Sequence, residues 1–288
     1  MIKTILVPVT GSACDEPAFA AAFAAAQRFA AHIDFLHVCI DPVEVALAMT
    51  SEVGGATLLD GLIEQLERDT REREAKAHRL FETFCTRQGL PTAGAPSDAA
   101  APGPSAEWHV ETGQDARWAA AYGMTADLAV AARPLKEAVI GGSVIEALLL
   151  QTGRPLLIPA AEPAAAAQAG TVAIAWKATP AAARAVAAAM PFLKSARRIV
   201  IIMVEEEGSR DSGERLAANL AWHGIRAETR RLKAKPDIAA QALLAAAAEE
   251  AGLLVMGGYG HSRLREWVFG GFTRRVLSDA PLPVLMMH

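Results

Sequence analysis

The chain repeats one order of segments twice along its 288 residues. Residues Thr4–Val9 correspond to Thr171–Trp176, and each apolar run ends in a polar turn followed by an Ala-rich segment of helical character. Near the end of each half, Gly142-Ser143 corresponds to Gly270-Gly271. A repeat of roughly 125–170 residues indicates a tandem of whole domains, since the units of a solenoid span only about 20–50 residues.

Short apolar runs alternate with helical segments in both halves, and this alternation sets the fold class. In the first half we expect strands at 5–9, 33–38, 108–110, 127–131 and 155–159, and helices at 17–31, 58–88, 115–123 and from 142 onward. In the second half we expect strands at 171–176, 199–204, 227–232, 253–256 and 284–286, and helices at 180–193, 212–223, 237–251 and from 272 onward. Strand–helix–strand order at short spacing favours parallel strands with right-handed crossovers. The sequence therefore predicts an α/β protein of two tandem open five-stranded parallel sheets, Rossmann-like, with helices on both faces.

The composition changes at the boundary between the halves. Residues 160–170 are rich in Ala and Pro, so we place one domain at 1–160, a linker at 161–170 and a second domain at 171–288. Residues 41–54 are expected to be irregular, and 91–105, rich in Pro, Ala and Gly, predict a surface loop.

Composition also excludes several classes of function. Hydrophobic residues make up 52% of the chain and the formal net charge is −4, which predicts a globular core without a general attraction to nucleic acid or anionic membrane. Three widely separated cysteines fit a reducing compartment, and no apolar segment is long enough for a signal peptide or a membrane span. The histidines lack the usual zinc-binding spacings, so the sequence predicts no metal site. We expect a cytoplasmic protein.

One glycine-rich stretch near the C-terminus has the features of a ligand loop. The apolar run Leu253–Met256 leads into Gly257 and Gly260, and Gly270-Gly271 follows after nine further residues. Glycines allow close approach of a ligand to the backbone, and the helix predicted to follow would offer free N–H groups to a phosphate. The stretch is not a Walker motif, because no Gly-Lys-Ser/Thr follows the loop.

The spacing Gly-x2-Gly-x9-Gly resembles the nucleotide-binding signature of the universal stress protein family, in which the last Gly precedes Ser or Thr. Here Gly271 takes that place. The resemblance covers nearly the whole chain and implies a fold related to the adenine nucleotide alpha hydrolases, with strand order 3-2-1-4-5 in each half. It also implies a site for ATP or a related adenine nucleotide at the point where the strand order reverses. The residues that it assigns to this site are Ala175, Trp176, Lys177, Val204, Met256, Gly257, Gly260, His261, Gly270, Gly271, Phe272 and Thr273.

The two halves are not equivalent at this loop. Ala132 and Leu135 stand where the second half has Gly257 and Gly260, so we expect nucleotide in the second half only. Lys177 stands where nucleotide-binding members of the family have Asp. It could pair with a phosphate or be a solvated loop residue. The glycines themselves could serve only the close packing of a strand against a helix.

The resemblance implies a stress protein that acts through an unidentified protein partner, with nucleotide as its ligand. The alternative is a scaffold protein of the same fold whose nucleotide pocket has decayed. Because the predicted crevice lacks the carboxylates that usually hold Mg²⁺, we expect no enzymatic activity beyond weak ATP hydrolysis. The repeat predicts an intramolecular pseudo-dimer and leaves homodimerisation open.

Overall fold

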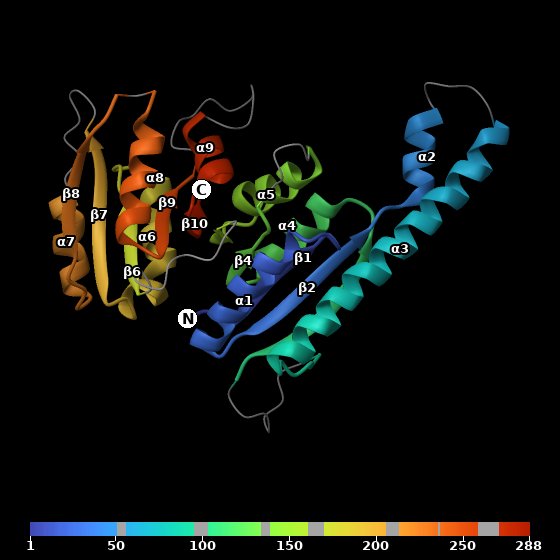
Figure 1. The fold of residues 1–288 in the computed structure, drawn as a ribbon, viewed down its shortest axis with the longest axis horizontal. Helices are drawn as coiled ribbons and strands as arrows, with labels where there is room; N and C mark the ends of the chain where they lie inside the picture. The colour runs from blue at the N-terminus through green and yellow to red at the C-terminus, as the bar shows by residue number, and fades with distance from the viewer. Residues whose placement is uncertain are drawn as a thin grey trace.

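The computed structural model describes residues 1–50, 56–94, 103–133, 139–160, 170–205, 213–235, 237–258 and 271–288. Its strands form one sheet in the order β3-β2-β1-β4-β5-β10-β9-β6-β7-β8 (Figure 1). The strands of the first half are β1 (Thr4–Val9), β2 (His32–Cys39), β3 (Ser105–Thr112), β4 (Leu128–Val130) and β5 (Leu156–Ile158). Those of the second half are β6 (Thr171–Ala175), β7 (Arg198–Glu205), β8 (Glu228–Lys233), β9 (Leu253–Gly257) and β10 (Val284–Met287).

Helices connect the strands and cover both faces of the sheet (Figure 1). The first half contains α1 (Asp15–Phe29), α2 (Pro42–Thr50), α3 (Ala56–Gln88), α4 (Asp115–Thr125) and α5 (Val139–Gln151). The second half contains α6 (Pro180–Lys194), α7 (Gly213–Trp222), α8 (Ala239–Glu250) and α9 (Gly271–Asp279). Among the described residues, no helix has both the length and the apolar character that crossing a membrane requires.

The two halves meet through their last strands. Within each half the neighbouring strands are parallel and follow the order 3-2-1-4-5. Between the halves, β5 and β10 pair antiparallel, with Leu157 opposite Leu285. An antiparallel contact between equivalent strands is what a pseudo-twofold axis requires, because equivalent elements meet their own counterparts. The predicted fold is confirmed, and the two sheets join into one through their final strands.

Successive side chains along each strand pack alternately into two hydrophobic layers, one on each face of the sheet. Both layers contain residues of both halves. In one layer, Phe19 of α1 packs edge-on against Phe35 of β2 at 4.8 Å between ring centroids. Across the two halves, Phe29 at the end of α1 meets Phe192 of α6 at 5.1 Å. The contact between the halves therefore extends beyond the β5–β10 pair.

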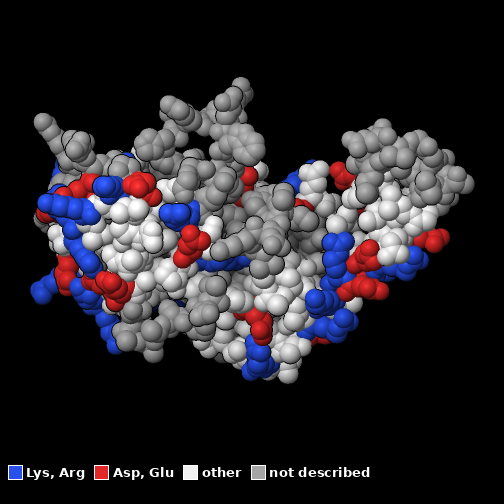
Figure 2. Space-filling model, turned by 45° about the horizontal axis from the view of Figure 1, so that its top comes forward, with Lys and Arg blue, Asp and Glu red and all other residues white. Residues whose placement is uncertain are grey.

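Helix α3 carries a strongly charged run at residues 67–76. Figure 2 shows basic and acidic side chains interspersed along this helix at the right of the molecule. Arg71 and Glu67 form an (i, i+4) ion pair at 2.7 Å, and both side chains are largely exposed. Exposed pairs of this kind contribute little to stability, so the run is a solvated face.

The prediction of irregular structure at 41–54 is wrong for residues 42–50, which form α2. Asp41 precedes the helix, and its side chain accepts hydrogen bonds from the backbone N–H groups of Val43 and Glu44 at 2.9 and 3.2 Å. Pro42 fits the first helical position because it has no N–H to satisfy. The Asp-Pro pair is thus an N-terminal helix signal that the sequence analysis missed. Residues 161–169 of the predicted linker and 95–102 of the predicted loop lie outside the described residues.

Candidate functional site

The carboxyl ends of β6 and β9 lie side by side where the strand order of the second half reverses. Ala175, the last residue of β6, is paired with Met256 of β9 on one side and with Ile202 of β7 on the other. The N–H of Trp176 continues the ladder and donates to the carbonyl of Ile202 at 2.9 Å. Open α/β sheets bind ligands outside the carboxyl ends of their strands at such a reversal. The structure therefore brings together the predicted residues Ala175, Trp176 and Met256.

Gly257 ends β9 directly beneath the first turn of α6. A Cβ atom at this position would lie 2.5 Å from the backbone nitrogen of Ala182 and 2.8 Å from the carbonyl carbon of Ala181. Backbone atoms cannot move aside as the tip of a side chain can. The glycine is therefore required for packing α6 against β9, whatever else it contacts.

A buried polar atom lies at the end of β6. The indole Nε1 of Trp176 is inaccessible to solvent and has no hydrogen-bond partner among the described residues. A buried N–H without a partner costs about 1–3 kcal/mol, and indole can only donate. The Trp176 ring packs against the hydrophobic layer that contains the buried face of α6.

The described part of helix α9 is Gly271–Asp279. Thr273 is buried and Phe272 is exposed. The predicted residues Gly260, His261 and Gly270 lie outside the described residues. The loop and the helix turn that follows it therefore stay predictions.

The remaining predicted residues flank the crevice. Lys177 follows Trp176 and is half-buried, and its carbonyl accepts from the N–H of Thr179 at 2.7 Å. Val204, near the end of β7, is half-buried and pairs with Leu232 of β8. The Thr179 hydroxyl caps α6 by accepting from the N–H of Ala182 at 3.2 Å, a role that the sequence analysis did not assign.

The corresponding turn in the first half is filled by the carboxylate of Asp15. One oxygen of this buried side chain accepts from the N–H groups of Thr10, Gly11 and Ser12 at 3.1, 2.7 and 3.1 Å, and the other accepts from the Thr10 hydroxyl at 2.9 Å. Burial raises the pKa of Asp15, although these hydrogen bonds oppose the shift. Three N–H groups directed at one oxygen resemble an anion-binding turn, and here the anion is part of the chain.

Helix α5 starts earlier than predicted. Gly142-Ser143, the counterpart of Gly270-Gly271, was expected to open α5, but this helix already includes Val139. Ser143 therefore lies inside the helix, past its first free N–H groups.

Arg133 holds the two halves together at the first-half loop, a role that the sequence did not suggest. It donates to the carbonyls of Val276 and Leu277 in α9 and to Pro159. Cationic donors suit the C-terminal end of a helix. Burial lowers the pKa of Arg133, while Asp279 opposes that shift.

In the second half, a Cβ at Gly258 would meet Leu149 of α5, the counterpart of Leu277 in α9. Leu135 lies outside the described residues.

Two doubly wound α/β units joined through their last strands define the class of fold with a ligand crevice at the carboxyl ends of the strands. The model of the universal stress protein family matches residues 1–160 and 155–288. The chain belongs to the universal stress protein family and contains two tandem domains of that family.

Solved structures agree in fold. A universal stress protein from Archaeoglobus fulgidus DSM 4304 aligns with a TM-score of 0.69 and 16% identity, covering 99% of this chain and 97% of that one. A protein of Pseudomonas aeruginosa UCBPP-PA14 described as a universal stress protein aligns with a TM-score of 0.55 and 13% identity, covering 99% of this chain and 93% of that one. Comparison with curated proteins finds no match.

Proposed function

We propose that this protein binds ATP or a related adenine nucleotide in its second half and that binding alters its interaction with a protein partner in a stress response. The observation that carries the proposal is the pairing of Ala175 with Met256 at the reversal of strand order. Open α/β sheets bind ligands at such a reversal, and the helix after the predicted loop would offer N–H groups suited to phosphate.

The two halves differ in the turn that follows their first strands. In the first half the carboxylate of Asp15 fills this turn, whereas in the second half Thr179 caps α6. These differences support a single site per chain.

A second function, that of a scaffold that needs no ligand, is favoured by the contact of Gly257 with α6. Close strand–helix packing is sufficient to require this glycine, so Gly257 alone does not call for a nucleotide. The half-buried Lys177 in place of the family Asp points the same way.

The decisive experiment begins with the protein as purified. Ultraviolet absorbance ratio and mass analysis of a denatured extract would reveal a co-purified nucleotide. ATP is then titrated into nucleotide-free protein by calorimetry, and we expect one site per chain. A protein that carries no nucleotide and takes up none would support the scaffold instead.

Substitution of Gly260 should weaken this binding. The Gly260→Val side chain would crowd the phosphate loop and restrict its backbone, so we expect a loss of about 1–3 kcal/mol, or roughly 5-fold to 160-fold in affinity. The matched control is Ser143→Ala in the first half, which should leave the affinity unchanged. Two equivalent sites, or a larger loss from Ser143→Ala than from Gly260→Val, would show that the proposal assigns the site to the wrong half.

We also expect no substantial turnover of ATP. The crevice has Lys177 where a carboxylate could hold Mg²⁺, and the sequence near the glycines offers no nucleophile paired with a base. Phosphate release in the presence of ATP and Mg²⁺ should stay well below about 1 per second, the lower end for ordinary enzymes. Phosphate release faster than this would contradict the prediction if a substitution of Lys177 abolished it.

A further inference from the structure

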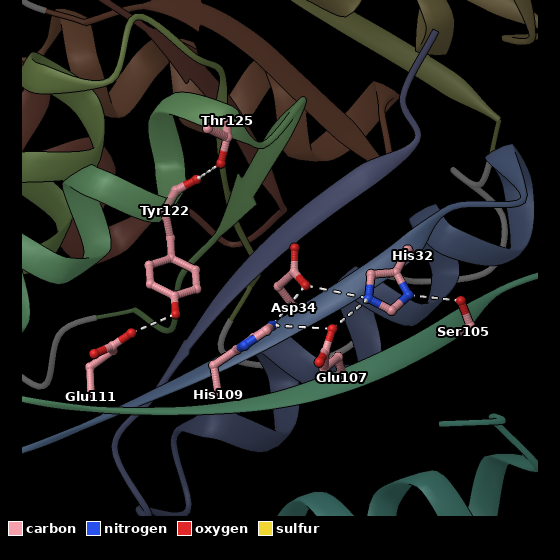
Figure 3. Close-up of polar contacts among 8 residues, drawn as sticks. All are labelled: His32, Asp34, Ser105, Glu107, His109, Glu111, Tyr122 and Thr125. Atoms are coloured by element: carbon pink, nitrogen blue, oxygen red, sulfur yellow. Dashed lines mark hydrogen bonds and ion pairs between the residues drawn. The ribbon is translucent and has the colours of Figure 1, made fainter. Parts of the chain in front are cut away.

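Two histidines and two carboxylates meet on the sheet face beside α4, near the start of β2 and in the middle of β3 (Figure 3). Asp34 and Glu107 lie opposite each other in the strand register, and His32 and His109 reach them from either side. All four side chains are partly buried, with exposed fractions of 23–33%. We call these four residues the His–carboxylate cluster. It lies away from the crevice, which is at the carboxyl ends of β6 and β9.

The distances within the cluster match the edges of a metal coordination sphere. The Nε2 atom of His32 lies 3.3 Å from Asp34 Oδ1 and 4.0 Å from Glu107 Oε2. The Nε2 atom of His109 lies 3.0 and 3.7 Å from the same two oxygens. A tetrahedral ion with bonds of about 2.0–2.2 Å to nitrogen and oxygen has ligand atoms about 3.3–3.6 Å apart. Among the described residues, His32, Asp34 and Glu107 form a group whose ligand atoms all lie within 4.8 Å of one another. His109 lies outside that group but contacts both of its carboxylates.

A neighbouring hydroxyl orients one of the imidazoles. The Oγ of Ser105 lies 2.8 Å from Nδ1 of His32, which leaves Nε2 directed at the carboxylates (Figure 3). Metal-binding histidines nearly always have such a partner on the second ring nitrogen, because it fixes both the ring and its tautomer. A solvated histidine on a sheet surface does not need one.

The equivalent place in the second half shows what the fold itself requires. By the strand registers, Arg198, Glu228 and Arg230 of β7 and β8 correspond to His32, Glu107 and His109. There Arg198 forms a two-pronged pair with Glu228 at 2.7 and 3.2 Å, and both arginines pair with Glu250 of α8. Arginine satisfies the carboxylates but cannot bind a metal, since it has no free electron pair. Any cationic side chain is therefore enough to pair with the carboxylates on this sheet face. Imidazole adds the capacity to bind a metal.

We propose that His32, Asp34, Glu107 and His109 bind one divalent transition-metal ion, with zinc as the best fit, which fastens β3 at the edge of the sheet to β2. Imidazole nitrogen with carboxylate oxygen is a ligand set suited to zinc and its neighbours rather than to Mg²⁺ or Ca²⁺, which take oxygen ligands. The sequence analysis missed the cluster because its two pairs, His32-x-Asp34 and Glu107-x-His109, come together only across paired strands.

The test uses the full chain without a histidine tag, stripped with a chelator. Zinc is titrated against a chromophoric competing chelator, and cobalt is titrated in parallel so that its visible absorption reports the coordination geometry. We expect one ion per chain. The double variant His32→Gln/His109→Gln and the single variant Glu107→Gln should each lose affinity by about 100-fold or more. The control Glu228→Gln, at the equivalent place in the second half, should bind zinc like the wild type.

Thermal unfolding supplies a second readout that does not depend on the competitor. Zinc should raise the melting temperature of the wild type and of Glu228→Gln, because it binds the folded state, and should leave that of the double variant unchanged. Circular dichroism without zinc establishes that each variant is folded, and Glu107→Gln serves alone if the double variant is not. An affinity equal in wild type and variants, or no zinc uptake by the wild type, would overturn the proposal. Neither result would bear on nucleotide binding.

Discussion

Replacing Asp15 by Ala should lower the free energy of unfolding by about 3–4 kcal/mol, to be measured by urea denaturation at neutral pH. The substitution removes the acceptor of three backbone N–H groups and one hydroxyl. Leaving a buried donor unsatisfied costs about 1–3 kcal/mol, and water can reach only the more exposed members of this set. The N–H of Gly11 is buried, so it should account for much of the loss.

Asp15→Asn is the matched control, because the amide oxygen can still accept from the three N–H groups. We expect this variant to keep most of the stability. A loss as large as that of Asp15→Ala would show that the negative charge, rather than the acceptor, holds the turn.

The pH dependence of the free energy of unfolding, compared between the wild type and Asp15→Asn, also tests the role of the Asp15 charge. Burial raises the pKa of Asp15 above its ordinary value of 3.8, so the folded chain holds this proton more tightly than the unfolded chain does. The contribution of the group to stability is therefore fully present below pH 3.8 and is lost as the pH rises through the raised folded value. Asp15→Asn should not show this loss. Denaturation curves of both proteins between about pH 3 and 7 would compare them.

The filled turn shows where prediction from sequence succeeds and where it stops. The offset between Gly142-Ser143 and Gly270-Gly271 predicted equivalent strands β5 and β10, and these strands do meet. Repeats, apolar runs and turn residues are local or periodic, so they can be recognised in a single sequence. The sequence did not reveal that Asp15 faces back into the turn before α1, since that depends on a side-chain direction.

The candidate site divides in the same way. Strand ends and helix starts place Ala175, Met256 and Gly271 from sequence, because the order of segments fixes the edge of a parallel sheet to which each belongs. The contact of His109 with Asp34 joins residues 75 positions apart. The local sequence around each residue does not indicate this contact. Contacts between paired strands depend on register, which the sequence does not state.

Gly257 is the residue whose meaning the sequence left open, and its substitution has the second large effect. We expect Gly257→Ala to lower the free energy of unfolding by about 2–3 kcal/mol, because overpacking against a fixed neighbour typically costs 1–3 kcal/mol. The added Cβ would lie 2.5 Å from the backbone nitrogen of Ala182, so α6 must shift away from β9. Urea denaturation of nucleotide-free protein measures the change.

The adjacent Gly258→Ala is the control for this prediction. Its Cβ would meet only the tips of the side chains of Leu149 and Met286, at 3.1 and 3.4 Å, which can rotate aside. We therefore expect a cost below about 1 kcal/mol. Equal losses in the two variants would show that α6 is free to move and that packing does not explain Gly257. If only Gly257→Ala is destabilised, the loss of nucleotide binding in that variant cannot locate the site, because the crevice wall itself has moved. Gly260, where the sequence alone predicts contact with phosphate, then becomes the position that separates ligand binding from folding.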